Sequence, residues 1–107
     1  MNTISRDELE AALESGEALT LLEALPEKYY RHGHLPGARW FPHDQARELS
    51  EKLLVEKDAP IVVYCANASC SNSHQAAQTL TELGYSDVRV YVEGKADWQA
   101  AGLSVER

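Results

Sequence analysis

The amino-acid sequence predicts an α/β protein with a central parallel sheet and helices on both of its faces. The run from Ile61 to Tyr64 is apolar and mostly β-branched, as in a strand that is covered on both faces. Apolar residues at positions 76, 77, 80 and 83 follow at helical spacing. Strand-like and helix-like segments also alternate along the chain, which is typical of a parallel sheet between two helical layers.

The N-terminal half supplies the first predicted elements. Ser5 and Glu8 have the spacing of a capping box, and apolar residues at helical spacing continue to Gly16. They predict a helix over residues 5–15. The apolar run at residues 18–22 predicts a buried strand. Residues 26–37 are predicted to be irregular, with at most one helical turn at 27–31. Residues 38–41 form a short strand candidate that Pro42 ends.

The C-terminal half repeats the alternation. Asp44 is predicted to cap a helix whose inner face is Ala46, Leu49 and Leu53. The strand at residues 61–64 leads through a polar segment into a helix that stops at Gly84. Residues 88–92 predict a further strand, and residues 95–101 a short final helix. We find no repeat, linker or low-complexity segment, and we expect residues 1–107 to form one domain.

Composition and charge exclude several classes of protein. The 107 residues are 44% hydrophobic and 25% charged, as in ordinary globular proteins. The formal net charge of −7 disfavours nucleic acids and anionic membranes as partners. No stretch approaches the length of a membrane-spanning helix. The polar N-terminal segment, residues 1–8, lacks the apolar run of a signal peptide, so we expect a cytoplasmic protein.

Cys65 is the strongest candidate for a reactive residue. It directly follows the buried strand, and a helix begins within a few residues. In parallel sheets, ligands bind beyond the carboxyl ends of the strands. Backbone amides and the helix dipole at such a loop favour a thiolate, so we expect an anionic, exposed sulfur. The loop that would surround it and bind the substrate is small and polar: Ala66, Asn67, Ala68, Ser69, Cys70 and Ser71.

Several motifs resemble those of rhodanese domains, in the same order and over nearly the whole chain. They are GHLPGA at Gly33–Ala38, Val63–Cys65, Leu83–Tyr85 and Gly94–Trp98. The resemblance implies a five-stranded parallel sheet wrapped by helices. It also implies a sulfurtransferase in which Cys65 accepts a sulfane sulfur and passes it on from a persulfide. The implied partners are a small-molecule sulfane-sulfur donor and a thiol or cyanide acceptor, or a partner protein. We expect no cofactor and no metal.

The loop departs from the pattern of that family. It lacks the Gly and Arg that many members carry, and Glu23 and Leu25 replace the aspartate and arginine that usually follow the first strand. Without a loop arginine, a dianion such as thiosulfate loses a charge-assisted partner. Persulfides of small molecules or proteins, or polysulfide, are therefore the favoured donors. In related phosphatases and arsenate reductases an arginine stands where this chain has Ser71, so phosphate chemistry is disfavoured.

Cys70 leaves more than one interpretation open. It can act as a resolving thiol that forms a disulfide with Cys65, which would also suit a redox switch or a non-catalytic module. Alternatively, it is a helix-entry residue without a role in the chemistry. A metal site of Cys65, Cys70 and His74 is disfavoured, because structural zinc takes four ligands at other spacings. The resemblance suggests a structural hydrogen-bonding role for His34.

Overall fold

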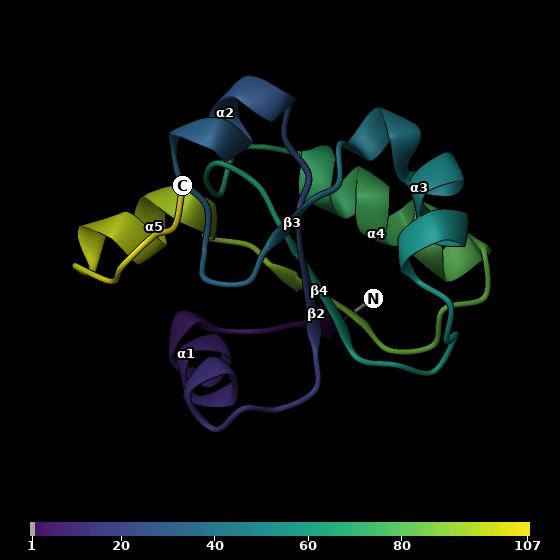
Figure 1. Cartoon of the computed structure of the whole chain (residues 1–107), viewed down its shortest axis with the longest axis horizontal. Coiled ribbons are helices and arrows are strands. Elements are labelled where there is room, and N and C mark those ends of the chain that lie inside the picture. The colour runs from purple at the N-terminus through teal and green to yellow at the C-terminus, as the bar shows by residue number, and fades with distance from the viewer. Residues whose placement is uncertain (1) are drawn as a thin grey trace.

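The computed structural model describes residues 2–107 and has at its centre a sheet of five parallel strands (Figure 1). The spatial order is β1-β5-β4-β2-β3, so β4 lies in the middle. Every neighbouring pair is parallel, which confirms the predicted fold class. The strands are β1 (Asn2–Thr3), β2 (Thr20–Glu23), β3 (Arg39–Trp40), β4 (Ile61–Tyr64) and β5 (Val88–Tyr91).

Five α-helices and one 3₁₀ turn surround the sheet. They are α1 (Arg6–Glu14), α2 (Glu27–His32), the turn η1 (His43–Gln45), α3 (Ala46–Leu53), α4 (Asn72–Glu82) and α5 (Gly94–Ala100). Figure 1 shows α1 and α5 on one side of the sheet and α3 and α4 on the other. None of these helices combines the length and the apolar character needed to cross a lipid bilayer; this holds for residues 2–107.

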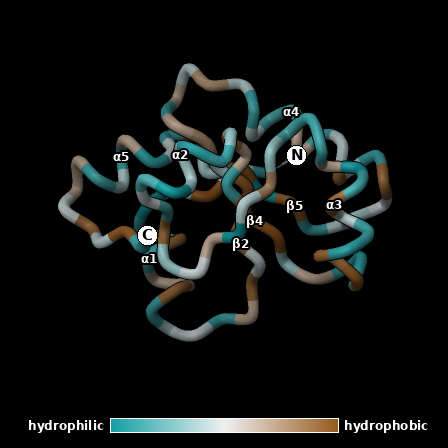
Figure 2. The backbone as a smooth tube through the Cα atoms, turned by 45° about the horizontal axis from the view of Figure 1, so that its top comes forward, coloured by the Kyte–Doolittle hydropathy of each residue, from teal (hydrophilic) through white to brown (hydrophobic). Residues whose placement is uncertain are grey.

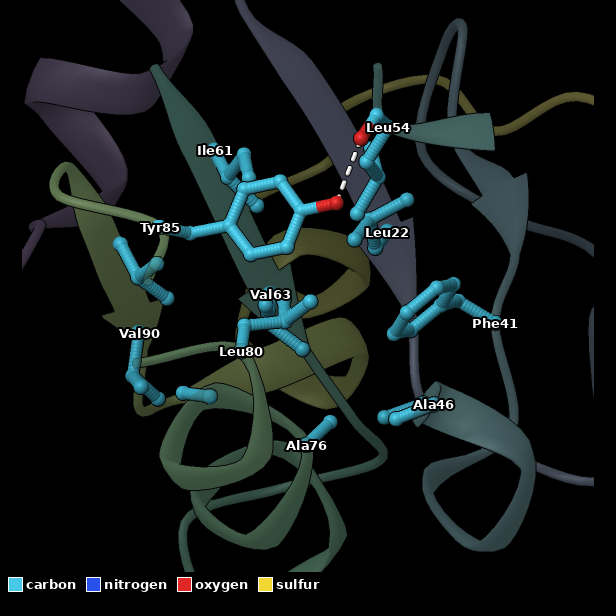
Figure 3. Packing of buried hydrophobic residues seen from close by; sticks show 13 residues of the cluster. Leu22, Phe41, Ala46, Leu54, Ile61, Val63, Ala76, Leu80, Tyr85 and Val90 are labelled. Carbon is cyan, nitrogen blue, oxygen red and sulfur yellow. Dashed lines mark hydrogen bonds between the residues drawn. The ribbon is translucent and has the colours of Figure 1, made fainter. Parts of the chain in front are cut away.

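Strand alternation divides the core into two clusters. One face of the sheet packs against α3 and α4 (Figure 3), through residues that include Leu22, Val63, Ala76, Leu80 and Val90. Within this cluster the Tyr85 hydroxyl donates to the carbonyl oxygen of Leu54. The other face packs against α1 and α5, through residues that include Leu9, Leu21, Val62, Tyr91 and Trp98. Because β4 is apolar at all four positions, it contributes to both clusters.

Hydropathy along the chain separates the buried centre of the sheet from the more exposed helix α2. In Figure 2 the backbone is hydrophobic along most of β4 and mainly hydrophilic along α2. No residue of α2 is fully buried. That helix lies above the carboxyl edge of the sheet, where it follows the end of β2 (Figure 1).

Most predicted elements are confirmed, with shifts of one or two residues at their ends. The capping box is present: the Ser5 hydroxyl accepts from the Glu8 amide, and the Glu8 carboxylate accepts from the Ser5 amide. The two-residue strand β1 has no alternating apolar pattern and was not predicted from local sequence. The helical turn predicted at 27–31 extends to His32.

The prediction that Asp44 caps the third helix is wrong. Asp44 lies inside the 3₁₀ turn η1, and no side chain caps α3, which begins after Gln45. Pro42 is the physical reason. It holds an extended backbone (φ −60°, ψ 138°), and its carbonyl oxygen accepts from the Gln45 amide at 3.0 Å. The chain therefore closes a tight turn around Asp44 before the α-helix starts.

Candidate active site

The carboxyl ends of β2, β3, β4 and β5 lie along one edge of the sheet. Register places Tyr64 between Glu23 on β2 and Tyr91 on β5, with Trp40 beyond Glu23. Cys65 follows Tyr64 and so stands at the tip of the central strand. This is the position at which parallel sheets bind ligands, and the predicted loop, residues 66–71, continues from it into α4.

Cys65 and Cys70 form a disulfide, with their Cα atoms 6.4 Å apart. The side chain of Cys65 is 1% exposed, and that of Cys70 is half-buried. The expectation of an exposed sulfur at position 65 is therefore wrong for this state of the protein. Cys70 folds back over Cys65 and shields its sulfur from solvent.

The loop is attached to α5 by its backbone. The amide of Lys95 donates to the carbonyl oxygen of Cys65 at 2.9 Å, and the amide of Ala96 donates to that of Ala66 at 2.8 Å. In a trans peptide the N–H points opposite to the C=O, and no peptide bond here is cis. The amides of Ala66 and Asn67 consequently point away from α5.

Gly94 permits this close approach. Its φ is +72°, and a Cβ atom there would lie 2.5 Å from the carbonyl oxygen of Cys65 and 2.9 Å from the amide nitrogen of Asn67. Such distances are too short for a side chain, and a positive φ disfavours one as well. Glycine is thus required at this position if the loop is to rest on the start of α5.

Asn67 closes the loop on itself. Its carbonyl oxygen accepts from the Cys70 amide at 3.2 Å. Its side-chain oxygen accepts from the Ser69 amide at 3.1 Å and from the Ser69 hydroxyl at 2.8 Å. The amides of Ser69 and Cys70 therefore already donate to Asn67 within the loop. Those of Ala66 and Asn67 point away from α5. The turn also carries Cys70 back toward Cys65.

Two polar atoms other than Cys70 sulfur lie near the sulfur of Cys65. The Ser73 hydroxyl oxygen is 3.5 Å away, and the carbonyl oxygen of Cys70 is 3.4 Å away. A hydroxyl can donate to a thiolate and stabilise it, whereas a carbonyl oxygen can only accept from a protonated thiol. The two neighbours therefore favour opposite protonation states of a reduced Cys65. Ser73 is itself buried, in the first turn of α4.

The surroundings of the loop along the chain carry no formal charge. No Asp, Glu, Lys or Arg occurs from Ala59 to Thr81. The helix α4 has no acidic side chain in its first turn, so the partial positive charge of its N-terminus is not offset from within the helix. Arg31 on α2 pairs with Glu27 of the same helix at 3.2 Å.

A buried polar network lies beside the loop at the end of β2. Glu23 is fully buried, and its Oε1 accepts from the Tyr64 hydroxyl at 2.7 Å and from Lys95 Nζ at 2.9 Å. Lys95 Nζ also donates to the carbonyl oxygen of Tyr29, and the Tyr64 oxygen accepts from the Leu35 amide. Burial, and next the nearby Glu23 charge, raise the pKa of Tyr64 well above its usual range.

In the sequence, Glu23 stands out only as a replacement for the usual aspartate. Lys95 stands out only as part of the motif Gly94–Trp98. Their pairing was missed, although a carboxylate inside an apolar run signals that a cation must reach it. The second carboxylate oxygen of Glu23, Oε2, is buried and has no hydrogen-bond partner among the described residues. The network links β2, β4, α2 and α5 at the place where the loop is attached.

His34 and His74 differ in their contacts and in their place relative to the loop. His34 Nδ1 donates to the carbonyl oxygen of Tyr30 at 3.0 Å, and the two rings stack with centroids 3.9 Å apart. This is the structural role that the resemblance implies. His74 lies in the first turn of α4 and is half-buried. Cys65, Cys70 and His74 do not form a metal-binding cluster, and residues 2–107 contain no other group of three His, Cys, Asp or Glu side chains suited to one.

Comparisons with known proteins agree with this architecture. The sequence profile of the rhodanese-like domain matches residues 5–101. The HTH-type transcriptional regulator Rv0324 of Mycobacterium tuberculosis is 34% identical over 98% of the chain, but the chain spans only 45% of that regulator. The uncharacterized protein YqhL of Bacillus subtilis is 26% identical over 92% of the chain and 72% of its own length.

Solved structures give the same relationship. The rhodanese-like domain of the Anabaena protein Alr3790 superimposes with a TM-score of 0.88 at 30% identity, over 99% of the chain and 79% of that protein. A thiosulfate sulfurtransferase from Pseudomonas aeruginosa superimposes with a TM-score of 0.88 at 28% identity. That likeness covers 100% of the chain and 20% of the larger enzyme.

Proposed function

Because the chain belongs to the rhodanese-like domain family, we propose that it is a sulfurtransferase that carries sulfane sulfur as a persulfide on Cys65. The observation that carries this proposal is the place of Cys65 at the tip of β4, on a loop held by the backbone of α5. This attachment turns the amides of Ala66 and Asn67 away from α5. Amides and the N-terminus of α4 are the groups available to stabilise an anionic sulfur.

The reaction needs Cys65 in its reduced form. The Cys65 thiolate attacks the sulfane sulfur of a donor, a new S–S bond forms, and the rest of the donor leaves with the electron pair of the broken bond. An acceptor nucleophile, such as a thiolate or cyanide, then attacks the outer sulfur and expels the Cys65 thiolate. Every step is a displacement at sulfur, so the residues of the loop suffice and no cofactor takes part.

The charge of the site favours particular donors. The loop offers no Lys or Arg side chain, and Ser71 stands where an oxyanion-binding arginine would be needed. Persulfides of small thiols, polysulfide or a partner protein's persulfide therefore suit the site better than thiosulfate. The net charge of −7 argues against nucleic acids and anionic membranes as partners. A cytoplasmic location, with its thiol pool, would keep Cys65 reduced.

The direct test is loading of the reduced protein with sulfur. After reduction, we expect glutathione persulfide to place one sulfur atom on Cys65, detected by intact mass spectrometry in a chain that lacks Cys70. The Cys65→Ser variant should gain none, and Cys70→Ser should still gain one. A sulfur adduct that persists in Cys65→Ser would move the chemistry to another residue and contradict the proposal.

A redox switch is the second candidate function, and the Cys65–Cys70 disulfide favours it. The similarity to part of a transcriptional regulator is consistent with a sensing module. A switch would form the disulfide readily and show negligible turnover with any sulfur donor. Steady-state sulfur transfer to cyanide that is lost in Cys65→Ser and kept in Cys70→Ser would count against it.

A further inference from the structure

The position of Cys70 suggests an activity beyond transfer to an external acceptor. Resting on the proposed persulfide at Cys65, we propose that Cys70 is an intramolecular acceptor that releases the transferred sulfur as hydrosulfide. The protein would then reduce sulfane sulfur to sulfide, with a dithiol as the electron source. The substrate class is a persulfide, and the second substrate is a thiol reductant.

Geometry brings the two sulfurs together without distortion of the strands or of α4. Their Cα atoms are 6.4 Å apart, within the range that disulfides span. The turn at Asn67 produces this proximity, through its carbonyl oxygen and the Cys70 amide. The residues between the two cysteines are small, so no bulky side chain separates the sulfurs.

The leaving group decides which sulfur Cys70 attacks. In the protonated form of the persulfide, attack of the Cys70 thiolate on the inner sulfur, Sγ of Cys65, forms the Cys65–Cys70 disulfide and expels hydrosulfide. Attack on the outer sulfur would expel the Cys65 thiolate and move the persulfide to Cys70. Hydrogen sulfide is a stronger acid than an ordinary cysteine thiol, so hydrosulfide is a competent leaving group for the first route. The observed pairing of Cys70 with Sγ of Cys65 is the product of the first route.

The loop offers no cationic side chain to retain the persulfide, which favours its release to Cys70. The polar neighbours of Cys65 Sγ, besides Cys70 sulfur, are a neutral hydroxyl on Ser73 and the carbonyl oxygen of Cys70. Neither carries the positive charge that would pair with an anionic outer sulfur. The carbonyl oxygen is repulsive toward such an anion. The Lys95 ammonium is engaged by Glu23 and by the carbonyl oxygen of Tyr29.

The electrons balance when a dithiol resets the protein. The donor persulfide loses its outer sulfur to Cys65 and leaves as a thiol. Cys70 and Cys65 are oxidised to the disulfide, and the transferred sulfur is reduced and released as hydrosulfide. A dithiol then reduces the disulfide and becomes oxidised itself. The sum is one persulfide and one dithiol converted to one thiol, one hydrogen sulfide and one oxidised dithiol.

A single-turnover experiment tests this inference. The reduced protein, freed of reductant under anaerobic conditions, is mixed with glutathione persulfide, and sulfide is followed against a sample without protein. We expect the wild-type chain to release one sulfide per chain and stop. Peptide mapping should then find the Cys65–Cys70 disulfide, and addition of a dithiol should restart release. Cys70→Ser should retain the added sulfur and release sulfide at least about tenfold more slowly.

The outcomes separate this inference from the proposed function. If Cys70→Ser gains no sulfur while circular dichroism shows it folded, both fail. If Cys70→Ser gains sulfur but the wild-type chain also keeps its sulfur, or releases sulfide no faster, only the role of Cys70 is overturned. A persulfide found on Cys70 overturns it as well. The wild-type measurement and the Cys70→Ala variant decide the matter if Cys70→Ser does not fold.

Discussion

The loop at Cys65 is supported differently on its two sides. On the α5 side, two backbone hydrogen bonds and the buried pair of Glu23 and Lys95 hold it, and Gly94 lets it lie in direct contact. On the α4 side, the supports are small uncharged residues, a hydroxyl on Ser73 and a disulfide. The contacts on the α5 side involve no sulfur atom, whereas those on the α4 side include the disulfide and the sulfur of Cys65.

This difference separates positioning from chemistry. Backbone contacts and a buried ion pair are expected to position the loop in either redox state, because neither involves a cysteine side chain. The contacts of Cys70 and Ser73 act on the reacting sulfur itself. Substitutions on the α5 side should therefore affect folding and reactivity together. Substitutions on the α4 side should affect reactivity with little change in stability.

The largest effect is expected when the buried pair is broken. Lys95→Met leaves the Glu23 carboxylate buried without a cation and should lower the free energy of unfolding by about 3 kcal/mol. We place it at the low end of the range for such pairs because Lys95 keeps 12% exposure. Denaturant titration measures the change. The double variant Glu23→Gln/Lys95→Met should recover part of the loss, and a double variant no better than Lys95→Met would contradict the pairing.

Gly94→Ala should come next, with a loss of about 2 kcal/mol of stability and slower sulfur loading of Cys65. Its Cβ would meet the carbonyl oxygen of Cys65 and push the loop away from α5. Gly16→Ala is a matched control, since Gly16 has φ +73° and nothing within 4 Å of a Cβ atom. It should cost only the backbone term, about 1 kcal/mol, and leave loading unchanged. Equal effects on loading would show that Gly94 does not position the loop.

A smaller effect should follow from Ser73→Ala, tested in a Cys70→Ser background so that Cys65 is free. Loss of the hydroxyl that donates to a Cys65 thiolate should raise the pKa of this thiol. Alkylation near neutral pH should slow by up to about tenfold, the equivalent of one hydrogen bond. The pH profile of alkylation measures the shift. Thr79→Val, which removes an exposed hydroxyl from the same helix, should leave that profile unchanged.

The smallest effect on the loop is expected from Ser5→Ala, which removes the cap of α1 but none of the hydrogen bonds of the loop. Stability should fall by about 1 kcal/mol, and sulfur loading under native conditions should stay as it was. This variant separates a general loss of stability from a change at the site. Slower loading in Ser5→Ala would mean that reactivity follows global stability, and the contrast between the two sides of the loop would not hold.

Much of the fold follows from local sequence signals. The apolar run Ile61–Tyr64 marked the central strand, and the Ser5–Glu8 capping box marked the start of α1. The strand β1 was not predicted because its two exposed residues show no alternation of apolar and polar side chains. Its place at the edge depends on pairing with β5, which is remote in sequence. The cap predicted at Asp44 was wrong because the preference of aspartate for helix caps does not predict the tight turn that follows Pro42.

The features of the site also separate into those that local sequence predicted and those that only the folded structure decides. Strand, loop and helix order was enough to place Cys65 at a strand tip, since those signals are local in the chain. Whether Cys70 reaches Cys65, and whether Glu23 finds Lys95, depends on how the loop turns at Asn67 and where α5 docks. The contact between Glu23 and Lys95 forms only when segments distant in sequence pack together. Residue type and spacing permit both contacts but do not decide whether they form.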